Sequence, residues 1–218
     1  MFGTRPQPLR LHRLDRLPAL AFLILGLLGC GSGPKQQEAA PTSRVAAVKA
    51  NPEAAAVSAG KWADVSYTAA NAPTMELPPV VPARPGGATP GFPRDRWVWL
   101  NVWATWCVPC VKEMPMMEQW KAQLKGEGLA VDLWYLSVDE QEKVLGNFLQ
   151  QRPAMAPGIS LRLKDFASLA AWLTKYQLDP GEAAIPIHLL LAPGGKVRYI
   201  HVGQLREADY RVLKELMQ

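Results

Sequence analysis

Apolar and polar positions divide the chain into two unlike parts at about residue 97. Beyond that point, continuous apolar runs, typical of strands buried on both faces, alternate with segments whose apolar residues recur every three or four positions, as in helices. This alternation predicts strands at 97–103, 129–138, 160–163, 185–191 and 196–202, and helices at 107–125, 140–151, 165–177 and 207–217. The order of these elements predicts an α/β fold with a central mixed sheet flanked by helices.

Turn and capping residues support these boundaries. Residues 192–195 (Ala-Pro-Gly-Gly) predict a hairpin turn, and Asp139 and Asp165 are expected to cap the helices that follow them. Pro115 lies inside the first helix, where the loss of a backbone hydrogen bond predicts a kink. The buried face of the third helix is predicted from apolar residues at helical spacing, namely Phe166, Leu169, Ala170 and Leu173.

The part before residue 97 has a different composition. Residues 30–60 are rich in Ala, Pro, Ser, Gln and Lys and contain no aromatic residue, so they predict a flexible linker. Residues 61–96 carry prolines at a density that excludes a regular helix or a central strand. They are expected to form a proline-rich N-terminal extension that packs, extended, against the edge of a domain at 97–218.

The first 29 residues are typical of an export signal. Several arginines precede an apolar run of twelve residues, Leu17–Leu28, which is shorter than the roughly 20 residues that span a membrane. The run ends in Leu27-Leu28-Gly29-Cys30, which resembles the bacterial lipobox, in which a lipid is attached to the cysteine. We therefore predict a lipoprotein signal peptide at 1–29, lipidation of Cys30 and a periplasm-facing location on a bacterial membrane. A soluble export signal with an incidental cysteine is the alternative.

The positive charge of the chain belongs mostly to this leader. The net charge is +5, but four arginines and only one acidic residue lie in the first 29 residues. The remaining chain therefore carries 20 basic against 18 acidic groups. This balance gives no reason to expect a nucleic-acid partner.

Lipidation of Cys30 would leave Cys107 and Cys110 as the only free thiols among the three cysteines. Both lie where the first predicted strand meets the first predicted helix, and a helix N-terminus stabilises a thiolate through its N–H groups and its dipole. A second cysteine three residues on can close a small disulfide ring. We predict that Cys107 attacks disulfides and that Cys110 resolves the mixed disulfide. A static structural disulfide is the alternative.

A single CxxC pair is also half of a common zinc site. No second cysteine pair exists, and His188 and His201 are about 80 or more residues away along the chain. We therefore expect neither a metal nor another cofactor.

Residues 100–115 (LNVWATWCVPCVKEMP) resemble the strand–motif–helix signature of the thioredoxin superfamily, and most closely its TlpA/ResA/CcmG-like membrane-anchored thiol–disulfide oxidoreductases. Pro115 falls where this group kinks its active-site helix, and Pro186 falls where it has a cis-proline facing the disulfide. The resemblance extends from residue 97 to the C-terminus and implies a thioredoxin-like fold.

The resemblance also implies roles for individual residues. Glu113, one turn beyond Cys110, is expected to accept the proton that Cys110 loses, with an exposed helix glutamate as the alternative reading. Asn101 stands where thioredoxin itself has a buried aspartate. Trp106, Ile185 and Pro186 are expected to bind an extended partner peptide. His188 is interpreted as a structural residue.

The predicted function is reduction of disulfides in extracytoplasmic proteins, such as apocytochrome c, with electrons from an upstream membrane donor. The resemblance favours this direction, and Val108 contributes neither charge nor donor that would mark a strong oxidant. Three rival functions are a peroxidase-like enzyme, a copper-binding carrier and an anchored interaction protein. A peroxidase would need a Thr-x-x spacing before its cysteine, and a copper carrier a CxxxC spacing, and the chain has neither at this site.

Overall fold

The computed structural model describes residues 62–218. The predicted signal peptide at 1–29, the linker at 30–60 and the lipidation site Cys30 lie outside the described residues. Among the described residues, none of the helices combines the length and the apolar character needed to cross a membrane.

A mixed sheet of seven strands forms the centre of the fold, in the order β1-β7-β6-β3-β4-β5-β2. Three parallel neighbours, β3 (Trp97–Trp103), β4 (Val131–Ser137) and β5 (Ile159–Leu163), make up one half. The antiparallel hairpin of β6 (Ile187–Ala192) and β7 (Lys196–Val202) extends the sheet on the other side of β3. The strand that leads to the cysteines is therefore central.

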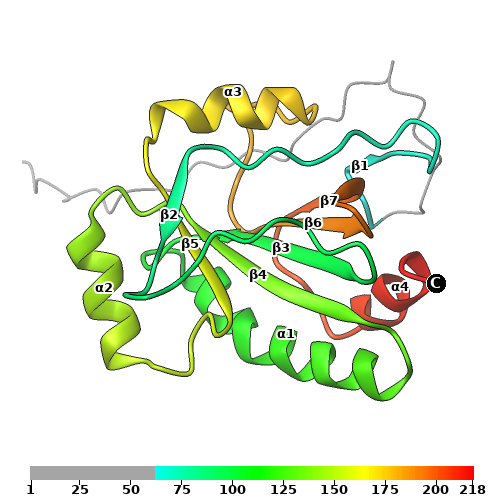
Figure 1. Cartoon of the computed structure of the whole chain (residues 1–218), viewed down its shortest axis with the longest axis horizontal. Coiled ribbons are helices and arrows are strands. Elements are labelled where there is room, and N and C mark those ends of the chain that lie inside the picture. The colour runs from blue at the N-terminus through cyan, green and yellow to red at the C-terminus, as the bar shows by residue number, and fades with distance from the viewer. Residues whose placement is uncertain (1–61) are drawn as a thin grey trace, which may run out of the picture. The chain divides into compact units, whose positions relative to one another are not determined.

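Helices cover both faces of this sheet. The crossovers β3-α1-β4 and β4-α2-β5 step in the same direction, and right-handed crossovers place α1 (Val108–Gly126) and α2 (Glu142–Gln151) on one face. Figure 1 shows α4 (Asp209–Leu216) beside α1, and α3 (Ala167–Lys175) across the sheet from α1. The predicted thioredoxin-like α/β fold is confirmed, and each strand and helix predicted after residue 97 is present with its ends within two residues.

Large aromatic side chains join the sheet to the helices on the α1 face. Trp99 and Trp103 are both fully buried on β3. Each is two positions from Asn101, so all three side chains point to the same face of the sheet. Trp99 stacks on Trp120 of α1 with ring centroids 6.3 Å apart, and Trp103 meets Phe148 of α2 at 5.7 Å. The continuous apolar run of β3 is therefore explained by burial on both sides of the sheet.

The proline-rich extension supplies both outer strands of the sheet. β1 (Val65–Ser66) pairs with β7, and β2 (Val80–Pro82) pairs with β5 at the opposite edge. Figure 1 shows the cyan chain crossing the sheet between the two edges on the side of α3. After β2, Phe92 of the extension stacks on Trp134 of β4, with ring centroids 4.9 Å apart. Packing against one edge was expected, and the structure shows that both edges are closed, which protects them from pairing with other chains.

The hairpin turn between β6 and β7 depends on glycine at one position. Gly195 adopts φ 73°, a left-handed conformation that favours glycine. A Cβ atom at this position would lie 2.7 Å from the ring of Phe92. The extension and the hairpin therefore approach each other more closely than any other residue type would allow.

One local prediction about the helices is wrong and a second is correct only in part. Asp139 does not cap α2, because the helix begins later, at Glu142, and its N-cap Gln141 makes no side-chain capping bond. The predicted buried face of α3 holds for Leu173, which is buried, and for Leu169, which packs partly buried against the core. It fails for Phe166, which is 49% exposed, and for Ala170, and Trp172 is buried in addition. In contrast, Asp165 does accept a hydrogen bond of 3.0 Å from the N–H of Ala167 at the start of α3. The N-cap residue itself is Phe166, so Asp165 binds the first N–H of the helix from one position before the cap.

Candidate active site

Cys107 and Cys110 form a disulfide at the start of α1, with their Cα atoms 5.3 Å apart. Cys107 is the N-cap residue of the helix and Cys110 lies in its first turn. The N–H of Cys110 donates to the Sγ of Cys107 over 3.3 Å. Once the disulfide is reduced, this N–H and the helix dipole stabilise a thiolate on Cys107. Cys107 is 5% exposed and Cys110 is fully buried, so Cys107 is the sulfur that a partner can reach.

The chain before β6 lies against this sulfur. The Ile185–Pro186 peptide bond is cis, and the carbonyl oxygen of Ile185 is 3.7 Å from the Sγ of Cys107. Trp106 and Val108, on either side of Cys107 in the sequence, are each 61% exposed. The structure thus brings the predicted substrate-binding residues to the accessible sulfur, with two exposed apolar side chains beside it.

Glu113 is a buried carboxylate on α1, one turn after Cys110. Its side chain belongs to the same helix face as Cys110, three residues earlier, and only 2% of the residue is exposed. Its Oε1 accepts from the amide of Asn101 over 3.4 Å, and its Oε2 accepts from the N–H of Leu205 over 3.1 Å. The alternative of an exposed helix glutamate is therefore wrong.

His188 completes this buried cluster, and the sequence contained no signal that pairs it with Glu113. The ring is fully buried on β6, and its Nε2 lies 3.2 Å from the Oε1 of Glu113. Its Nδ1 accepts from the indole N–H of Trp99 over 3.3 Å. His188 faces Asn101 across the β3–β6 pairing, which only the strand register could have shown.

Tyr135 lies on the same face of the sheet, on β4 opposite Asn101. Its hydroxyl donates to Oε1 of Glu118 over 2.8 Å. Burial first, and then the carboxylates of Glu118 and Glu113, raise the pKa of Tyr135 above its usual range. The phenol therefore stays protonated and acts as a donor at neutral pH.

The loop before Cys107 is anchored by Asp139, which is 3% exposed. Both carboxylate oxygens lie within 3.2 Å of the N–H of Thr105, and Oδ1 also accepts from the Thr105 hydroxyl over 2.7 Å. Oδ2 accepts from the hydroxyl of Ser137 over 2.7 Å. These donors explain why Asp139 is turned toward the active-site loop and away from α2.

Asp139→Asn is expected to lower the free energy of unfolding by about 1–3 kcal/mol. The substitution replaces one acceptor oxygen by an NH₂ group, so one of the donors on Thr105 or Ser137 loses its acceptor and faces another donor. Chemical unfolding in urea, followed by circular dichroism, measures this loss. Glu140→Gln is the matched control, because Glu140 is exposed. The free energy of unfolding of this variant should stay within about 0.5 kcal/mol of the parent. Equal stability of Asp139→Asn and the parent would contradict the anchoring role.

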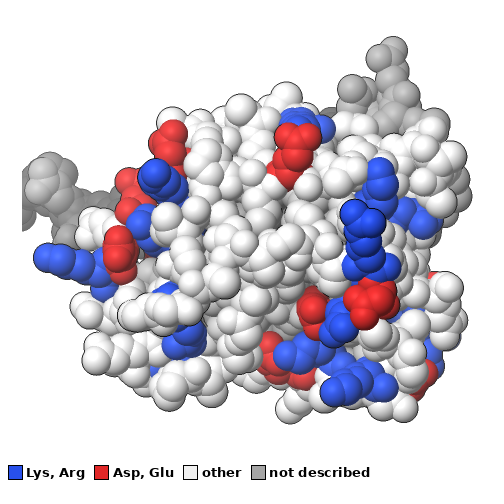
Figure 2. All heavy atoms as spheres, viewed as in Figure 1, with Lys and Arg blue, Asp and Glu red and all other residues white. Residues whose placement is uncertain are grey.

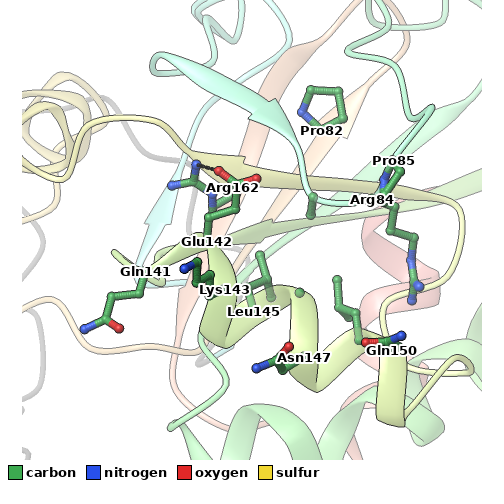
Figure 3. Close-up of a pocket in the computed structure, with 13 residues that line it drawn as sticks. Pro82, Arg84, Pro85, Gln141, Glu142, Lys143, Leu145, Asn147, Gln150 and Arg162 are labelled. Carbon is green, nitrogen blue, oxygen red and sulfur yellow. Dashed lines mark hydrogen bonds and ion pairs between the residues drawn. The ribbon is translucent and has the colours of Figure 1, made fainter.

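A groove lies elsewhere on the molecule, between α2 and the loop that follows β2 (Figure 3). Its lining contains none of the cysteine, cis-proline or Glu113 residues. Two of its cations are engaged within the chain: Arg162 pairs with Glu142 at 3.3 Å, and Arg84 donates to the carbonyl of Met155 over 2.6 Å. The groove therefore presents no assembled anion site, and the candidate chemistry remains at the disulfide.

Charges of both signs are interspersed at the two ends of the face seen in Figure 2, and the centre of that face is largely uncharged. Among residues 62–218, no group of three or more His, Cys, Asp or Glu side chains is arranged to hold a metal ion.

The chain is similar to several curated proteins named thiol–disulfide oxidoreductase ResA, although no family model matches it. It is 40% identical over 58 residues to that of Bacillus anthracis, which is 27% of this chain and 32% of the relative. It is 28% identical over 115 residues to that of Bacillus subtilis (strain 168), covering 53% of this chain and 58% of the relative. The matches thus span about a third to three fifths of these relatives.

Solved structures that resemble the chain include a thioredoxin-related protein from Neisseria meningitidis serogroup B. It is 28% identical and matches 64% of this chain and 98% of its own, with a TM-score of 0.47. StoA from Bacillus subtilis is 18% identical and matches 65% of this chain and 98% of its own, with a TM-score of 0.41.

The fold and the cysteine pair define a thioredoxin-like protein. Within that class, the ResA relatives confirm the resemblance to the TlpA/ResA/CcmG-like group of the thioredoxin superfamily, and their names support a thiol–disulfide oxidoreductase.

Proposed function

We propose that this protein is a thiol–disulfide oxidoreductase that reduces disulfides of extracytoplasmic partner proteins. The observation that carries the proposal is the asymmetry of the disulfide. The outer sulfur, Cys107, is at the helix N-terminus and next to the backbone of Ile185, whereas Cys110 is fully buried. This asymmetry argues against a static disulfide, because it provides one sulfur for attack and a second, protected sulfur for resolution.

The reaction starts from the dithiol form. The thiolate of Cys107 attacks one sulfur of the partner disulfide, forms a mixed disulfide and expels the other partner sulfur as a thiolate, which takes up a proton from water. An extended segment of the partner lies along the backbone at Ile185 and Pro186, with Trp106 as an apolar contact.

Resolution follows within the protein. The Cys110 thiol gives its proton to the buried carboxylate of Glu113, and the resulting thiolate attacks the Sγ of Cys107. The second partner sulfur leaves, so the partner has gained two electrons and this protein ends as the Cys107–Cys110 disulfide. An upstream membrane donor with a dithiol would then return the two electrons.

Location and partner follow from the same proposal. Lipid on Cys30 would anchor the domain at the outer side of a bacterial inner membrane or in the outer membrane, where disulfides persist. Apocytochrome c is a suitable partner because its haem-binding C-x-x-C-H segment forms a small disulfide in an extended chain. The copper-carrier alternative is weakened by His188, whose ring nitrogens face Trp99 and Glu113 in the interior.

The test uses the reduced protein and two disulfide substrates, a small chromogenic aromatic disulfide and an oxidised peptide containing C-x-x-C-H. We expect the protein to release two aromatic thiolates per molecule and to reduce the peptide, which chromatography of the peptide measures. Reaction with the aromatic disulfide alone would contradict the proposed partner class. Failure to react with either substrate would contradict the exchange activity itself.

A further inference from the structure

The hydrogen bonds of the His188 ring indicate which of its two nitrogens carries the proton. The Nδ1 atom accepts from the indole N–H of Trp99, and the amide nitrogen of Asn101 lies 3.4 Å from the same atom. A ring nitrogen that accepts hydrogen bonds carries no proton, so the proton of the neutral imidazole is on Nε2. The side chain is fully buried, and Glu113 Oε1 lies 3.2 Å from this Nε2.

The carboxylate of Glu113 is the acceptor that lies beside Nε2. Nε2 makes no aligned hydrogen bond to any group of residues 62–218, Glu113 included, and a buried N–H without an acceptor is unfavourable. The carboxylate oxygen 3.2 Å away is the acceptor that a small rotation of the ring brings into line. Asn101 donates from its amide to the same Oε1. A donor on β3 and the unpartnered Nε2 on β6 therefore both lie against one oxygen of the carboxylate.

The other carboxylate oxygen has room for a proton. A carboxylate accepts at about four positions, two on each oxygen. On Glu113, Oε1 faces Asn101 and His188, while Oε2 accepts from the N–H of Leu205. One position on Oε2 remains for the proton of Cys110.

We propose that His188 is a positioning residue for Glu113: its Nε2–H occupies Oε1 and leaves Oε2 as the oxygen that exchanges a proton with Cys110. This inference rests on the proposed thiol–disulfide exchange, and it assigns to His188 a part in the resolving step alone. The proton moves from the Sγ of Cys110 to Oε2, and the histidine keeps its own proton throughout.

A matched control exists on the neighbouring strand. His201 pairs with His188 across β6 and β7, and the two rings stack with centroids 5.9 Å apart. The Nδ1 of His201 instead lies 2.6 Å from the carbonyl oxygen of Trp62 and 3.4 Å from Asp64. His201→Phe therefore replaces an imidazole in the same part of the sheet by a phenyl ring without removing a contact to Glu113.

The kinetic test is a stopped-flow reaction of the reduced protein with the aromatic disulfide. The first thiolate reports attack by Cys107, and the second reports resolution by Cys110. We expect His188→Phe to slow the second phase about tenfold and to leave the first within a factor of about two, because one donor to a charged group is lost. His188→Gln, which keeps an N–H near the position of Nε2, should recover much of the rate. His201→Phe should leave both phases unchanged.

The second measurement is independent of exchange. Nitrogen NMR of ¹⁵N-histidine-labelled parent protein should show a protonated Nε2 and an unprotonated Nδ1 for His188 at pH 7, with His188→Phe identifying the signals. A proton on Nδ1, or a normal second phase in folded His188→Phe, would overturn the inference. If the parent releases no second thiolate, the proposed function fails instead, and the tautomer still reports whether His188 donates to Glu113.

Discussion

Cys107→Ser protein is expected to lose disulfide exchange by at least about a thousandfold, whereas Cys110→Ser protein should still react but stop halfway. The reason is the position of the two sulfurs, since Cys107 is accessible at the N-cap and Cys110 is fully buried. Removing the attacking thiol leaves no nucleophile for the first step. Removing the resolving thiol leaves the first step intact and the mixed disulfide without an exit.

Mass spectrometry of the products distinguishes the two variants. Cys110→Ser should hold one aromatic thiol per molecule after reaction with the aromatic disulfide, and the amount of thiolate released should fall from two to one per molecule. In cells, the same variant should accumulate mixed disulfides with its physiological partners. A stable adduct on Cys107→Ser, formed through Cys110, would reverse the assigned roles.

Trp103→Ala is expected to lower the free energy of unfolding by about 3–5 kcal/mol, which is a large share of the stability of a single domain. Trp103 is fully buried at the end of β3, and its ring meets Phe148 of α2. Its removal leaves a cavity between the sheet and α2, directly before the active-site loop. Urea unfolding followed by circular dichroism measures the change.

Trp106→Ala is the matched control, because it lies three residues further on and 61% of it is exposed. Its stability should stay within about 0.5 kcal/mol of the parent. The same variant should reduce the C-x-x-C-H peptide more slowly if Trp106 contacts the partner. Equal stability losses for the two tryptophan variants would contradict the assignment of Trp103 to the core.

Elements were predictable where the signal lies within the element itself. The bounds of β3 and β7 match the prediction at both ends, because a continuous apolar run and a Pro-Gly-Gly turn mark them locally. The start of α1 could be placed within one residue because Cys107 follows directly on the strand and loop. The Asp139 prediction failed because capping depends on which donors are nearest, and the nearest belong to Thr105 and Ser137.

The extension shows the same limit in a different way. Its prolines correctly excluded a helix or a central strand, since proline lacks the N–H that the interior of a sheet requires. They did not reveal that β1 and β2 close opposite edges. That arrangement depends on pairing with β7 and β5, which lie about 80 or more residues away along the chain.

By itself, the sequence determined the type of chemistry and its place at a strand–helix junction, because Cys107 and Cys110 are neighbours on one helical turn. Only the tertiary structure decided which groups surround them. The chain at β6 brings Ile185 to Cys107 and His188 to Glu113, from positions widely separated from α1 in the sequence. A strand buried on both faces has no polar alternation to show where a side chain points, so the partner of His188 could be found only from the strand register.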